Sequence, residues 1–542
     1  MGREANIHSI KALEKQIKED KGNIIELKRA RNLLLNISTR VPPEILGNIF
    51  TWSLAREASR SQSHFDGLRK GSYNFPLVCH HWFEVASRTP ELWSFWGNTL
   101  QDWKKRYHRS GAAPLDLVLD EDKCDPDVLF DKSLQGAIRG HVARGTVRQV
   151  HLSLCGDTLT SIISSLTPDD EGARNENIES IVWQNLGALV DASDFFGRSC
   201  FSKLCRLDLI GDFRISSWDS LATRTTLLTT LSLGISSPPP TASQLFSILT
   251  SNPNLQQLTL SDLIPPDSAN GSVLQVPLRN LKLLSLRGEF RHLFGLLRRL
   301  ALPETLNTVE LVGLDATVEE ISQILEPYMR DYFRCDVRFQ DRLEVSSISC
   351  DESVSVSVRV PCTQDTVPTQ KPFVAYTVVL ADPPPPDVME RLSVDLITLV
   401  PQEYVVSLSA SLDIDPPEEL FSTAPNIEFL CLDNVDLSEG FLQPNPDGPR
   451  ANTKLLPSLR SLRLENIGLD DNDWGHLITY LAHQTSDDQI ISLDVCGYRP
   501  YMCAGVANKI KDLVEFVPFP NLEGQGRGTP RNCGCSSHEE DE

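Results

Sequence analysis

The stretch of sequence that decides the fold is residues 204–211, which read Leu204-Cys205-Arg206-Leu207-Asp208-Leu209-Ile210-Gly211. Leucine alternates here with charged side chains, as in a β-strand with one buried face, and a glycine follows where a chain can turn sharply. The motif, apolar-x-x-apolar-x-apolar, occurs in ten frames that start at Val147, Ile178, Leu204, Leu228, Leu255, Leu281, Leu306, Ile427, Leu459 and Ile490. The sequence therefore predicts an internal repeat built on one strand per unit.

The spacing of the frames and a second column of residues support this repeat. Successive starts lie 31, 26, 24, 27, 26 and 25 residues apart, then 121, then 32 and 31. In eight of the ten frames the residue seven positions after the start tolerates positive φ, and these residues are Asn185, Gly211, Asp262, Gly288, Gly313, Asn434, Asn466 and Gly497. Unrelated leucines would not produce such a column, so we expect a sharp turn after each strand.

In period and pattern the frames resemble leucine-rich repeats. That family usually has its asparagine one position later, so the resemblance implies irregular repeats without a regular asparagine ladder. It also implies a solenoid with parallel inner strands, inward side chains such as Leu207 and Leu209, and an outer layer of helices or loops. Helical periodicity over residues 243–249 and 316–329 predicts two of these helices. An unrelated α/β fold is the alternative.

The repeat frame is lost between about residues 331 and 425. Residues 353–360 alternate strictly between polar and apolar, which predicts a half-buried strand, and residues 373–380 are a second strand candidate. Four prolines, residues 383–386, follow as a linker or turn. The segment is either an inserted hairpin that lies against the repeats or two to four degenerate repeats, because 121 residues is close to four periods.

A second motif lies nearer the N-terminus. Its first part reads Val41-Pro42-Pro43-Glu44-Ile45-Leu46-Gly47-Asn48-Ile49-Phe50, which places four apolar residues on one face of a helix with a proline in the first turn. In its second part Val78, Trp82 and Val85 repeat on one helical face, and Leu92-Trp93 follows. Two such short helices cannot bury both faces alone.

These residues resemble the F-box. Its pattern is matched by Pro42, Glu44, Ile45, Leu46, Ile49, Val78, Cys79, Trp82, Leu92 and Trp93. Two departures are Val41, where leucine is usual, and an insert at about residues 51–74, where most F-boxes have a short connection. An ordinary helical hairpin in a larger core is the alternative.

The F-box resemblance implies binding to a Skp1-like adaptor and, through it, to a cullin. We expect the matching residues to divide between the packing of the motif itself and a groove on that adaptor. The predicted adaptor-binding residues are Pro42, Pro43, Ile45, Leu46, Ile49, Phe50, Leu77, Val78, Trp82, Leu92 and Trp93.

The N-terminal residues carry a heptad pattern. Ile10, Ile17 and Ile24 occupy one core position, Leu13, Leu27 and Leu34 the other, and the charged Asp20 and Arg31 fill the remaining core positions. We expect an amphipathic helix that packs on another part of the protein, and a coiled-coil dimer is the alternative.

Composition narrows the class of partner. A formal net charge of −22 argues against nucleic-acid and anionic-membrane partners, which require basic surface. The 13 cysteines lack zinc-ligand spacing and are predicted to be free thiols of a reducing compartment, in the cytoplasm or the nucleus. We expect no secretion signal and no membrane-spanning segment, because no long uncharged apolar run is present.

The sequence predicts no catalytic chemistry. It lacks the phosphate-binding loop, the Gly-x-Ser-x-Gly nucleophile turn and the His-Glu-x-x-His zinc helix. Cys533, Cys535 and His538 come nearest to a metal cluster, but no fourth ligand lies near them. We therefore predict that the protein is not an enzyme and has no metal and no cofactor.

The repeats predict a second binding surface for an unknown protein substrate. It consists of polar residues that alternate with the buried leucines, namely Arg206, Asp208, Gln257, Thr259, Ser285, Arg287, Arg463, Glu465, Ser492 and Asp494. A polar surface of mixed charge suits a protein or peptide partner. The predicted function is substrate recruitment for a ubiquitin ligase, and the alternative is an interaction scaffold without that role.

The predicted fold class is α/β (α+β), with an N-terminal helical F-box followed by an irregular leucine-rich-repeat solenoid with parallel inner strands. The predicted division is an amphipathic helix at 1–36, the F-box at 37–96, a linker leading into the repeats at 97–146, the repeats at 147–515, and a disordered acidic tail at 516–542.

Overall fold

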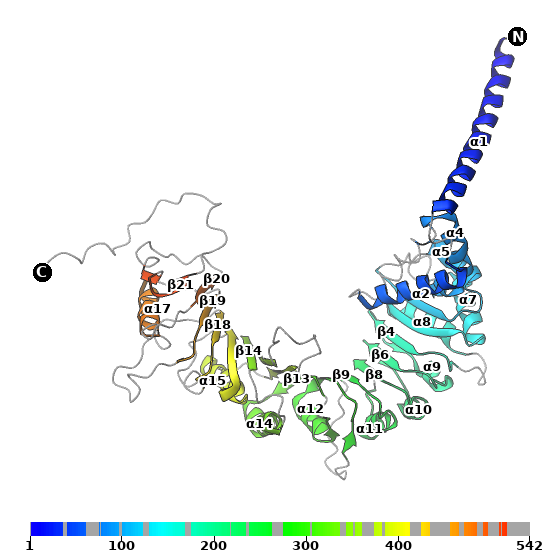
Figure 1. Ribbon diagram of the computed structural model, residues 1–542. Coiled ribbons are helices and arrows are strands. Elements are labelled where there is room, and N and C mark those ends of the chain that lie inside the picture. Colours follow the sequence, from blue (N-terminus) through cyan, green and yellow to red (C-terminus); the bar gives the residue numbers. More distant parts are fainter. Residues whose placement is uncertain are drawn as a thin grey trace, which may run out of the picture. The chain divides into compact units, whose positions relative to one another are not determined.

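The computed structural model contains two compact units, residues 1–238 and 239–542. It describes residues 2–35, 41–60, 75, 77–96, 100–122, 129, 131–168, 175–216, 218–234, 238–262, 275–303, 306–335, 343–350, 353–359, 373–381, 385–411, 424–433, 456–465, 471–484, 492–496, 509–510 and 512–516. Both units are mixed α/β and are built on sheets whose strands are mainly parallel, as Figure 1 shows. The predicted acidic tail lies, except for its first residue, outside the described residues.

The first unit begins with helices. These are α1 (Gly2–Leu35), α2 (Pro43–Arg60), α4 (His80–Arg88) and the short 3₁₀ helix η2 (Pro90–Leu92). α2 continues through residues 51–60, the first ten residues of the predicted insert. No proline or glycine interrupts residues 51–60, and the Thr51 hydroxyl donates to the Gly47 carbonyl oxygen at 3.0 Å. Residues 61–74 lie outside the described part of the chain.

Six parallel strands form the sheet of the first unit. In spatial order they are β1 (Phe95–Trp96), β2 (Leu115–Asp120), β3 (Val147–Leu154), β4 (Ser180–Asn185), β6 (Arg206–Ile210) and β8 (Thr230–Gly234). The sheet thus begins at Phe95, and the predicted entry to the repeats, residues 97–146, is part of this unit. They contribute β2 and the helices α5 (Leu100–Ser110) and α7 (Lys132–Ala143).

Two rows of apolar side chains cross this sheet in register. One contains Leu117, Val150, Ile181, Leu207 and Leu231, and the other contains Leu119, Leu152, Trp183, Leu209 and Leu233. All ten are buried, and each contributes roughly 1.5–3 kcal/mol of burial free energy. The helices α7, α8 (Gly156–Leu166), α9 (Ser193–Arg198) and α10 (Trp218–Arg224) lie on one face of the sheet (Figure 1). A small parallel pair, β5 (Val190–Asp191) and β7 (Phe213–Arg214), connects two of the turns.

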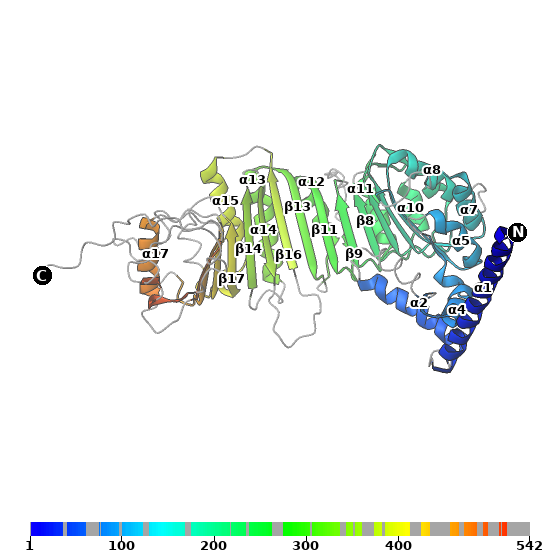
Figure 2. The same cartoon turned by 90° about the horizontal axis from the view of Figure 1, so that it is seen from above.

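The sheet of the second unit has eleven described strands. In spatial order they are β9 (Gln257–Ser261), β11 (Leu283–Glu289), β13 (Thr308–Ala316), β16 (Phe373–Leu380), β15 (Ser353–Arg359), β14 (Leu343–Cys350), β17 (Val405–Ser411), β18 (Phe429–Asp433), β19 (Ser461–Glu465), β20 (Ser492–Cys496) and β21 (Glu515–Phe516). Figure 2 shows many of them side by side. A separate pair joins β10 (Val276–Pro277) to β12 (Leu300–Ala301).

The interruption of the repeat frame is a meander within the sheet. β14, β15 and β16 pair antiparallel, while β16 pairs in parallel with β13 and β14 pairs in parallel with β17. The strands predicted at 353–360 and 373–380 are confirmed as β15 and β16. Neither alternative for this segment is correct as stated. The hairpin does not lie against the sheet but is part of it, and one of its strands reverses the parallel direction.

Two corresponding apolar rows cross the sheet of the second unit and pass through this meander. The first contains Leu258, Leu284, Val309, Val374, Val358, Val345, Leu408, Leu430, Leu462 and Leu493. The second includes Tyr376 and Val356, and the Tyr376 hydroxyl donates to the Leu396 carbonyl oxygen of α15 at 2.6 Å. Because the alternation of inward and outward residues is preserved, the reversed strand fits the same core.

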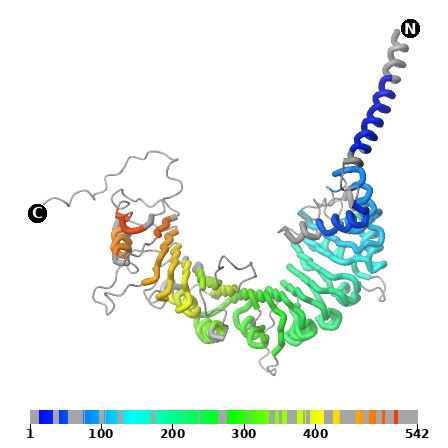
Figure 3. The backbone as a smooth tube through the Cα atoms, viewed as in Figure 1, coloured from blue at the N-terminus to red at the C-terminus, as the bar shows by residue number. Residues whose placement is uncertain are grey.

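Helices also follow the strands of the second unit. They are α11 (Ala242–Ser251), α12 (Phe290–Leu297), α13 (Val318–Glu320), the π-helical turn η3 (Ile321–Leu325), α14 (Glu326–Cys335), α15 (Pro386–Thr398), the 3₁₀ turn η5 (Gln402–Tyr404) and α17 (Asp471–Gln484). The helices predicted at 243–249 and 316–329 are confirmed, and each begins at a capping box, with Thr241 and Thr317 as the N-caps. Figure 3 shows the backbone passing from strand to helix and back to the next strand.

The turn residues serve different purposes. Gly211, Asp262 and Gly288 have positive φ, as predicted. Asn185 does not, and its amide nitrogen donates instead to the carbonyl oxygens of Ala188 and Asp212, both at 2.8 Å. Gly313 is required by close packing, since a Cβ there would lie 2.6 Å from the Phe290 ring. The column therefore marks a turn at some positions and a strand residue at others, such as Gly288 opposite Gly313, and its last three members lie outside the described residues.

Candidate functional site

The first candidate surface belongs to the N-terminal helical module, residues 41–96. Its core contains Leu46, Phe50, Val85, Ala86, Leu92 and Trp93, with Val41, Phe75 and Trp82 packed against it. The Phe50 ring is fully buried, with its centroid 4.4 Å from that of Phe75 and 4.9 Å from that of Trp82. α2 supplies Leu46 and Phe50 because residues four apart share one helical face.

Three contacts hold the end of the module, two of them to α4 and one to α5. The Trp93 indole nitrogen donates to the Ala86 carbonyl oxygen at 2.6 Å, and the Thr89 hydroxyl donates to the Val85 carbonyl oxygen at 2.8 Å. The Arg109 guanidinium lies 4.4 Å from the centroid of a Trp93 ring, which is cation–π distance. These contacts fix the last turn of the module, so its two helices present a defined outer surface.

The outer surface of the module carries large apolar side chains. Ile45, Ile49 and Trp52 lie at i, i+4 and i+7 on α2 and are 51%, 49% and 66% exposed. Leu77 and Val78, just before α4, are 80% and 56% exposed. We call these five residues the exposed apolar set. Single exposed apolar residues are ordinary, but five within two short segments are typical of an interaction surface.

The structure divides the predicted adaptor-binding residues into two groups. Leu46, Phe50, Leu92 and Trp93 are at most 5% exposed, so they belong to the packing of the motif itself and not to its exposed surface. These four side chains pack in the core of the module, so they can affect binding only through the shape of the module. Pro42 and Pro43 are exposed, and Trp82 is partly buried against Phe50.

Trp52 was missed because the sequence assigned it to the insert. Its position seven residues after Ile45 was the available signal, since residues seven apart share one face of a continuous helix.

A polar pocket of about 570 Å³ opens between α2 and the turn after α4. Its lining includes Glu44, Glu84, Arg88 and Glu91, and Glu84 also lies 3.7 Å from the His80 ring nitrogen Nδ1. The module therefore combines exposed apolar side chains with a charged border, a mixture that is common in protein interfaces.

The module is continuous with the sheet of the first unit. β1, which directly follows Trp93 and Ser94, pairs in parallel with β2 through Phe95 opposite Asp116 and Trp96 opposite Leu117. The Arg106 guanidinium donates to the Phe95 carbonyl oxygen at 2.7 Å. No flexible connection separates the module from this sheet.

The second candidate surface is the face of the first unit's sheet opposite the apolar rows. Arg148 donates to both carboxylate oxygens of Asp116, at 2.9 and 2.6 Å, and this pairing raises the pKa of Arg148. The His151 ring nitrogen Nε2 lies 3.0 Å from the Ser180 hydroxyl oxygen. Sequence reasoning missed both pairs, although each residue alternates with the buried leucines as Arg206 does.

The structure corrects the prediction for Asp208. It was expected on an open polar face, but it is only 5% exposed. Arg206 donates to its oxygen Oδ2 at 2.8 and 2.6 Å, whereas the other oxygen, Oδ1, is buried without a hydrogen-bond partner. Burial raises the pKa of Asp208 despite the neighbouring cation. Arg206 is half exposed and remains available to a partner.

The third candidate surface is the corresponding face of the second unit's sheet. Gln257, Arg287 and Arg463 are exposed there, and Thr259, Ser285, Glu465, Ser492 and Asp494 are partly exposed. Its ion pairs are open to water. Arg463 lies 2.5 Å from Glu465 and 3.7 Å from Asp494, and Arg287 lies 3.8 Å from Asp262.

The meander places small hydroxyl side chains on the same face. Ser346 and Ser357 share a hydrogen bond, and the Thr377 hydroxyl donates to the Ser355 oxygen at 3.0 Å. In the order of the strands, these short side chains lie between the two charged regions. The sequence signal for this feature was the alternation of serine and valine at 353–360.

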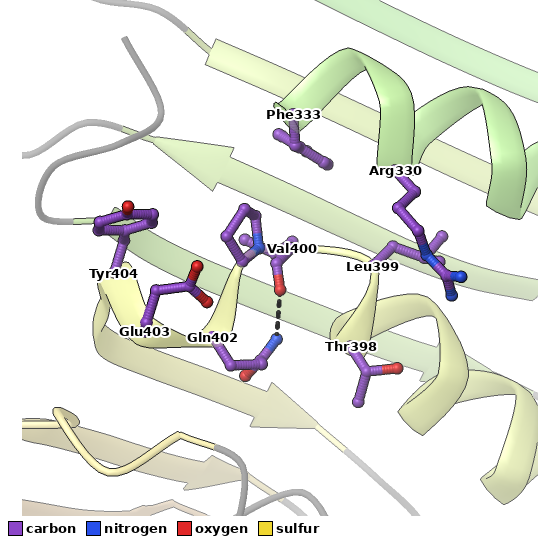
Figure 4. A pocket seen from close by; sticks show the side chains of 9 residues that line it. Arg330, Phe333, Thr398, Leu399, Val400, Gln402, Glu403 and Tyr404 are labelled. Atoms are coloured by element: carbon purple, nitrogen blue, oxygen red, sulfur yellow. Dashed lines mark hydrogen bonds between the residues drawn. The ribbon is translucent and has the colours of Figure 1, made fainter. Parts of the chain in front are cut away.

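A pocket of about 330 Å³ lies at the end of α15, and Figure 4 shows its lining. Arg330, Thr398, Glu403 and Tyr404 line it together with the buried ring of Phe333. The Gln402 amide donates to the carbonyl oxygens of Ile397 and Val400, both at 2.8 Å, and so caps the helix end. This capping accounts for the Gln402 amide nitrogen, whereas its amide oxygen is buried without a hydrogen-bond partner.

The described residues do not meet the requirements of two other kinds of site, a metal site and a membrane span. Among them, no group of three or more His, Cys, Asp or Glu side chains could hold a metal ion. None of the helices searched within the described ranges has the length and apolar character that crossing a membrane requires. The cysteines whose side chains are described, Cys79, Cys155, Cys200, Cys205 and Cys431, are free thiols. Cys533, Cys535 and His538 lie outside the described residues.

No known protein-family model matches the chain, and no curated protein sequence matches it. Function must therefore be inferred from the geometry of the surfaces.

Proposed function

We propose that the chain is the substrate-recruiting subunit of a Skp1-cullin-F-box type ubiquitin ligase. The observation that carries this proposal is the division within the N-terminal module. The residues that resemble the F-box pattern separate into a closed core around Phe50 and an exposed apolar set around Ile49. A helical pair that needed only to stabilise itself would not leave five large apolar side chains in water.

The exposed apolar set supplies the binding free energy for a Skp1-like adaptor. Burying one such side chain contributes roughly 1.5–3 kcal/mol of binding free energy. Burying all five therefore offsets part of the free-energy cost of association. Ile45, Ile49 and Trp52 give an anchor pattern along one side of α2, which suits insertion into an apolar groove. The adaptor in turn connects the chain to a cullin.

In this proposal the sheets are irregular leucine-rich repeats that hold the target. Their in-register apolar rows and strand–helix alternation support a solenoid. The open faces are polar with both signs of charge, which suits a protein target. The chain performs no chemistry of its own. It holds the target near a ubiquitin-charged enzyme in the cytoplasm or nucleus, where proximity accelerates the transfer.

The test is co-purification of the full chain with a Skp1-like adaptor. The double variant Ile49→Asp and Val78→Asp places charges in the exposed apolar set without touching the core, because both side chains are about half exposed. We expect it to lose adaptor binding by at least about 100-fold. The control is Leu186→Asp, a similarly exposed leucine beyond β4, which should bind normally. Adaptor binding by the double variant that equals that of the natural chain would contradict the proposal.

A scaffold without a ubiquitin ligase role is the second candidate. The pairing of β1 with β2 favours it, because the module then serves as a cap on the end of the sheet. A cap protects the sheet edge and requires no adaptor. Stable partners recovered without any adaptor or cullin, unchanged by the double variant, would favour the scaffold.

A further inference from the structure

α1 presents an unpartnered apolar seam. Leu13, Ile17, Ile24 and Leu27 are each between 50 and 70% exposed, although they follow the heptad spacing of a coiled-coil core. The sequence predicted that this helix packs on another part of the protein, and the described side chains show no such packing within the chain. The ion pair between Lys15 and Glu19 lies outside the seam.

Two charged residues interrupt the seam, and their signs are opposite. Asp20 occupies one core position and Arg31 the other, and both are exposed. A charge in a coiled-coil core costs stability unless the facing position compensates it, so core charges select the partner and its direction.

We propose that α1 pairs with α1 of a second copy of this chain as an antiparallel coiled coil. In an antiparallel pair, one type of core position faces the other type, so Asp20 can face Arg31 of the partner copy. Ile24 lies four residues after Asp20, and Leu27 lies four residues before Arg31, so the same alignment places Ile24 against Leu27. The two-fold axis repeats both contacts. Two apolar layers are thereby enclosed by two ion pairs.

Other arrangements of the seam bring no opposite charge to Asp20. A parallel pair in register would place Asp20 against Asp20 and Arg31 against Arg31. Insertion into a membrane surface would take Asp20 into an apolar layer with no counter-charge. In the antiparallel pair Lys21 and Lys28 face each other on the outer border, but exposed like charges are screened and cost only tenths of a kcal/mol.

The experiment is sedimentation of the purified full chain over a range of concentrations. We expect reversible dimers, and we expect Asp20→Arg and Arg31→Asp each to raise the dissociation constant at least about 100-fold, because like charges then meet in the core. An equimolar mixture of these two variants should associate again. The double variant Asp20→Arg with Arg31→Asp should dimerise like the natural chain. Glu19→Arg, an equal change of charge outside the seam, is the matched control and should have no effect.

Four results would overturn the proposal. They are a natural chain that stays monomeric at all concentrations, dimers that persist in Asp20→Arg, a double variant that fails to dimerise, and a monomeric chain that binds vesicles containing phosphatidylserine. Dimers that persist in Asp20→Arg indicate a parallel pair, because a parallel pair already places like charges in its core and this change leaves like charges there. The measurement uses no adaptor, so its outcome is independent of the proposed ligase role.

Discussion

The sheets of the two units bury equivalent apolar rows on one face. They differ in the polar side chains of the other face. In the first unit, the buried Asp116 accepts two hydrogen bonds from the partly exposed Arg148, and His151 and Ser180 are buried together as a second closed pair. In the second unit the pairs are open to water, as around Arg463, and hydroxyl side chains occupy the centre.

This difference suggests separate roles for the two faces, one in the stability of the fold and the other in binding a partner. Closed polar pairs contribute to a fixed structure, because removing one member leaves the other buried without a partner. Open pairs are worth little to folding, so a partner can replace them at low cost. The second unit therefore offers the better surface for an exchangeable target, and the first unit offers the more rigid support for the N-terminal module.

The largest expected effect concerns the meander of the second unit. Val356, on the reversed strand β15, is fully buried and lies opposite Ser347 and Tyr376. Val356→Asp places an unpaired charge in the core and should cost about 4 kcal/mol or more of the second unit's stability. Hydrogen exchange measured by mass spectrometry should show lost protection from β11 to β19, with the first unit unchanged.

Ser355→Asp is the matched control for this change. Ser355 is one residue away on the opposite face, and an aspartate there can still accept the hydrogen bond from Thr377, so the effect should stay within about 0.5 kcal/mol. Loss of protection confined to β14, β15 and β16 would show that the meander is an independent insertion and not the middle of one cooperative sheet.

The next effect is a pH dependence of the first unit. His141 on α7 is fully buried, its ring nitrogen Nδ1 lies 2.8 Å from the Thr146 hydroxyl, and the rings of Trp96 and Tyr107 pack edge-on against it. Burial, and secondarily the charge of Arg144, lowers the pKa of His141 to about 4.

Between pH 6.5 and 4 the unfolded chain therefore binds a proton that the folded chain does not, and stability should fall by up to about 3 kcal/mol as the pH drops. Thermal unfolding of the first unit followed over this range should show a steeper decline in the natural chain than in His141→Phe, which keeps the ring packing without the titration. Equal slopes in the two proteins would contradict the assigned pKa.

A smaller effect is expected when one ion pair is removed from each unit and the two losses of stability are compared. Arg148→Ala leaves Asp116, which is 9% exposed, without its bidentate partner and should cost about 1–3 kcal/mol. Arg463→Ala removes a half-exposed arginine and should cost at most about 1 kcal/mol. Hydrogen-exchange protection, measured locally in each unit, gives the stability loss of each variant. Similar costs for the two variants would remove the distinction between closed and open faces.

The regular part of the fold follows from local pattern. The strands were predictable because alternation and turn residues are local properties, and the structure buries the first residue of every described frame, for example Leu204 and Leu255. The meander was not, because the direction of β15 depends on which strands it pairs with, and alternation is the same in a parallel and an antiparallel strand.

The candidate surfaces were predictable only in part. Helical period places Ile45 with Ile49 on one face of the helix and Leu46 with Phe50 on the neighbouring face. It cannot say which of the two faces packs in the core until the position of the second helix is known. Asp208 looked like a surface residue because it alternates with leucine, yet it lies buried beside Arg206 on its own strand. Which alternating residues become closed pairs depends on register between strands, which no single strand encodes.

The smallest effect tests whether Asp208 is a stabilising member of its pair. Because burial raises its pKa, the ionised carboxylate is less stable in the folded chain than in the unfolded chain, even beside Arg206. Asp208→Asn removes that charge and should change stability by less than about 1 kcal/mol at neutral pH, in contrast to Arg148→Ala. The natural chain should also gain stability as the pH falls through the raised pKa, because the folded state then takes up the proton first, and the variant should lack this gain. If unfolding measurements instead give a loss as large as that of Arg148→Ala, the Arg206 pair is a closed stabilising pair, and the first unit has no half-satisfied charge on this face.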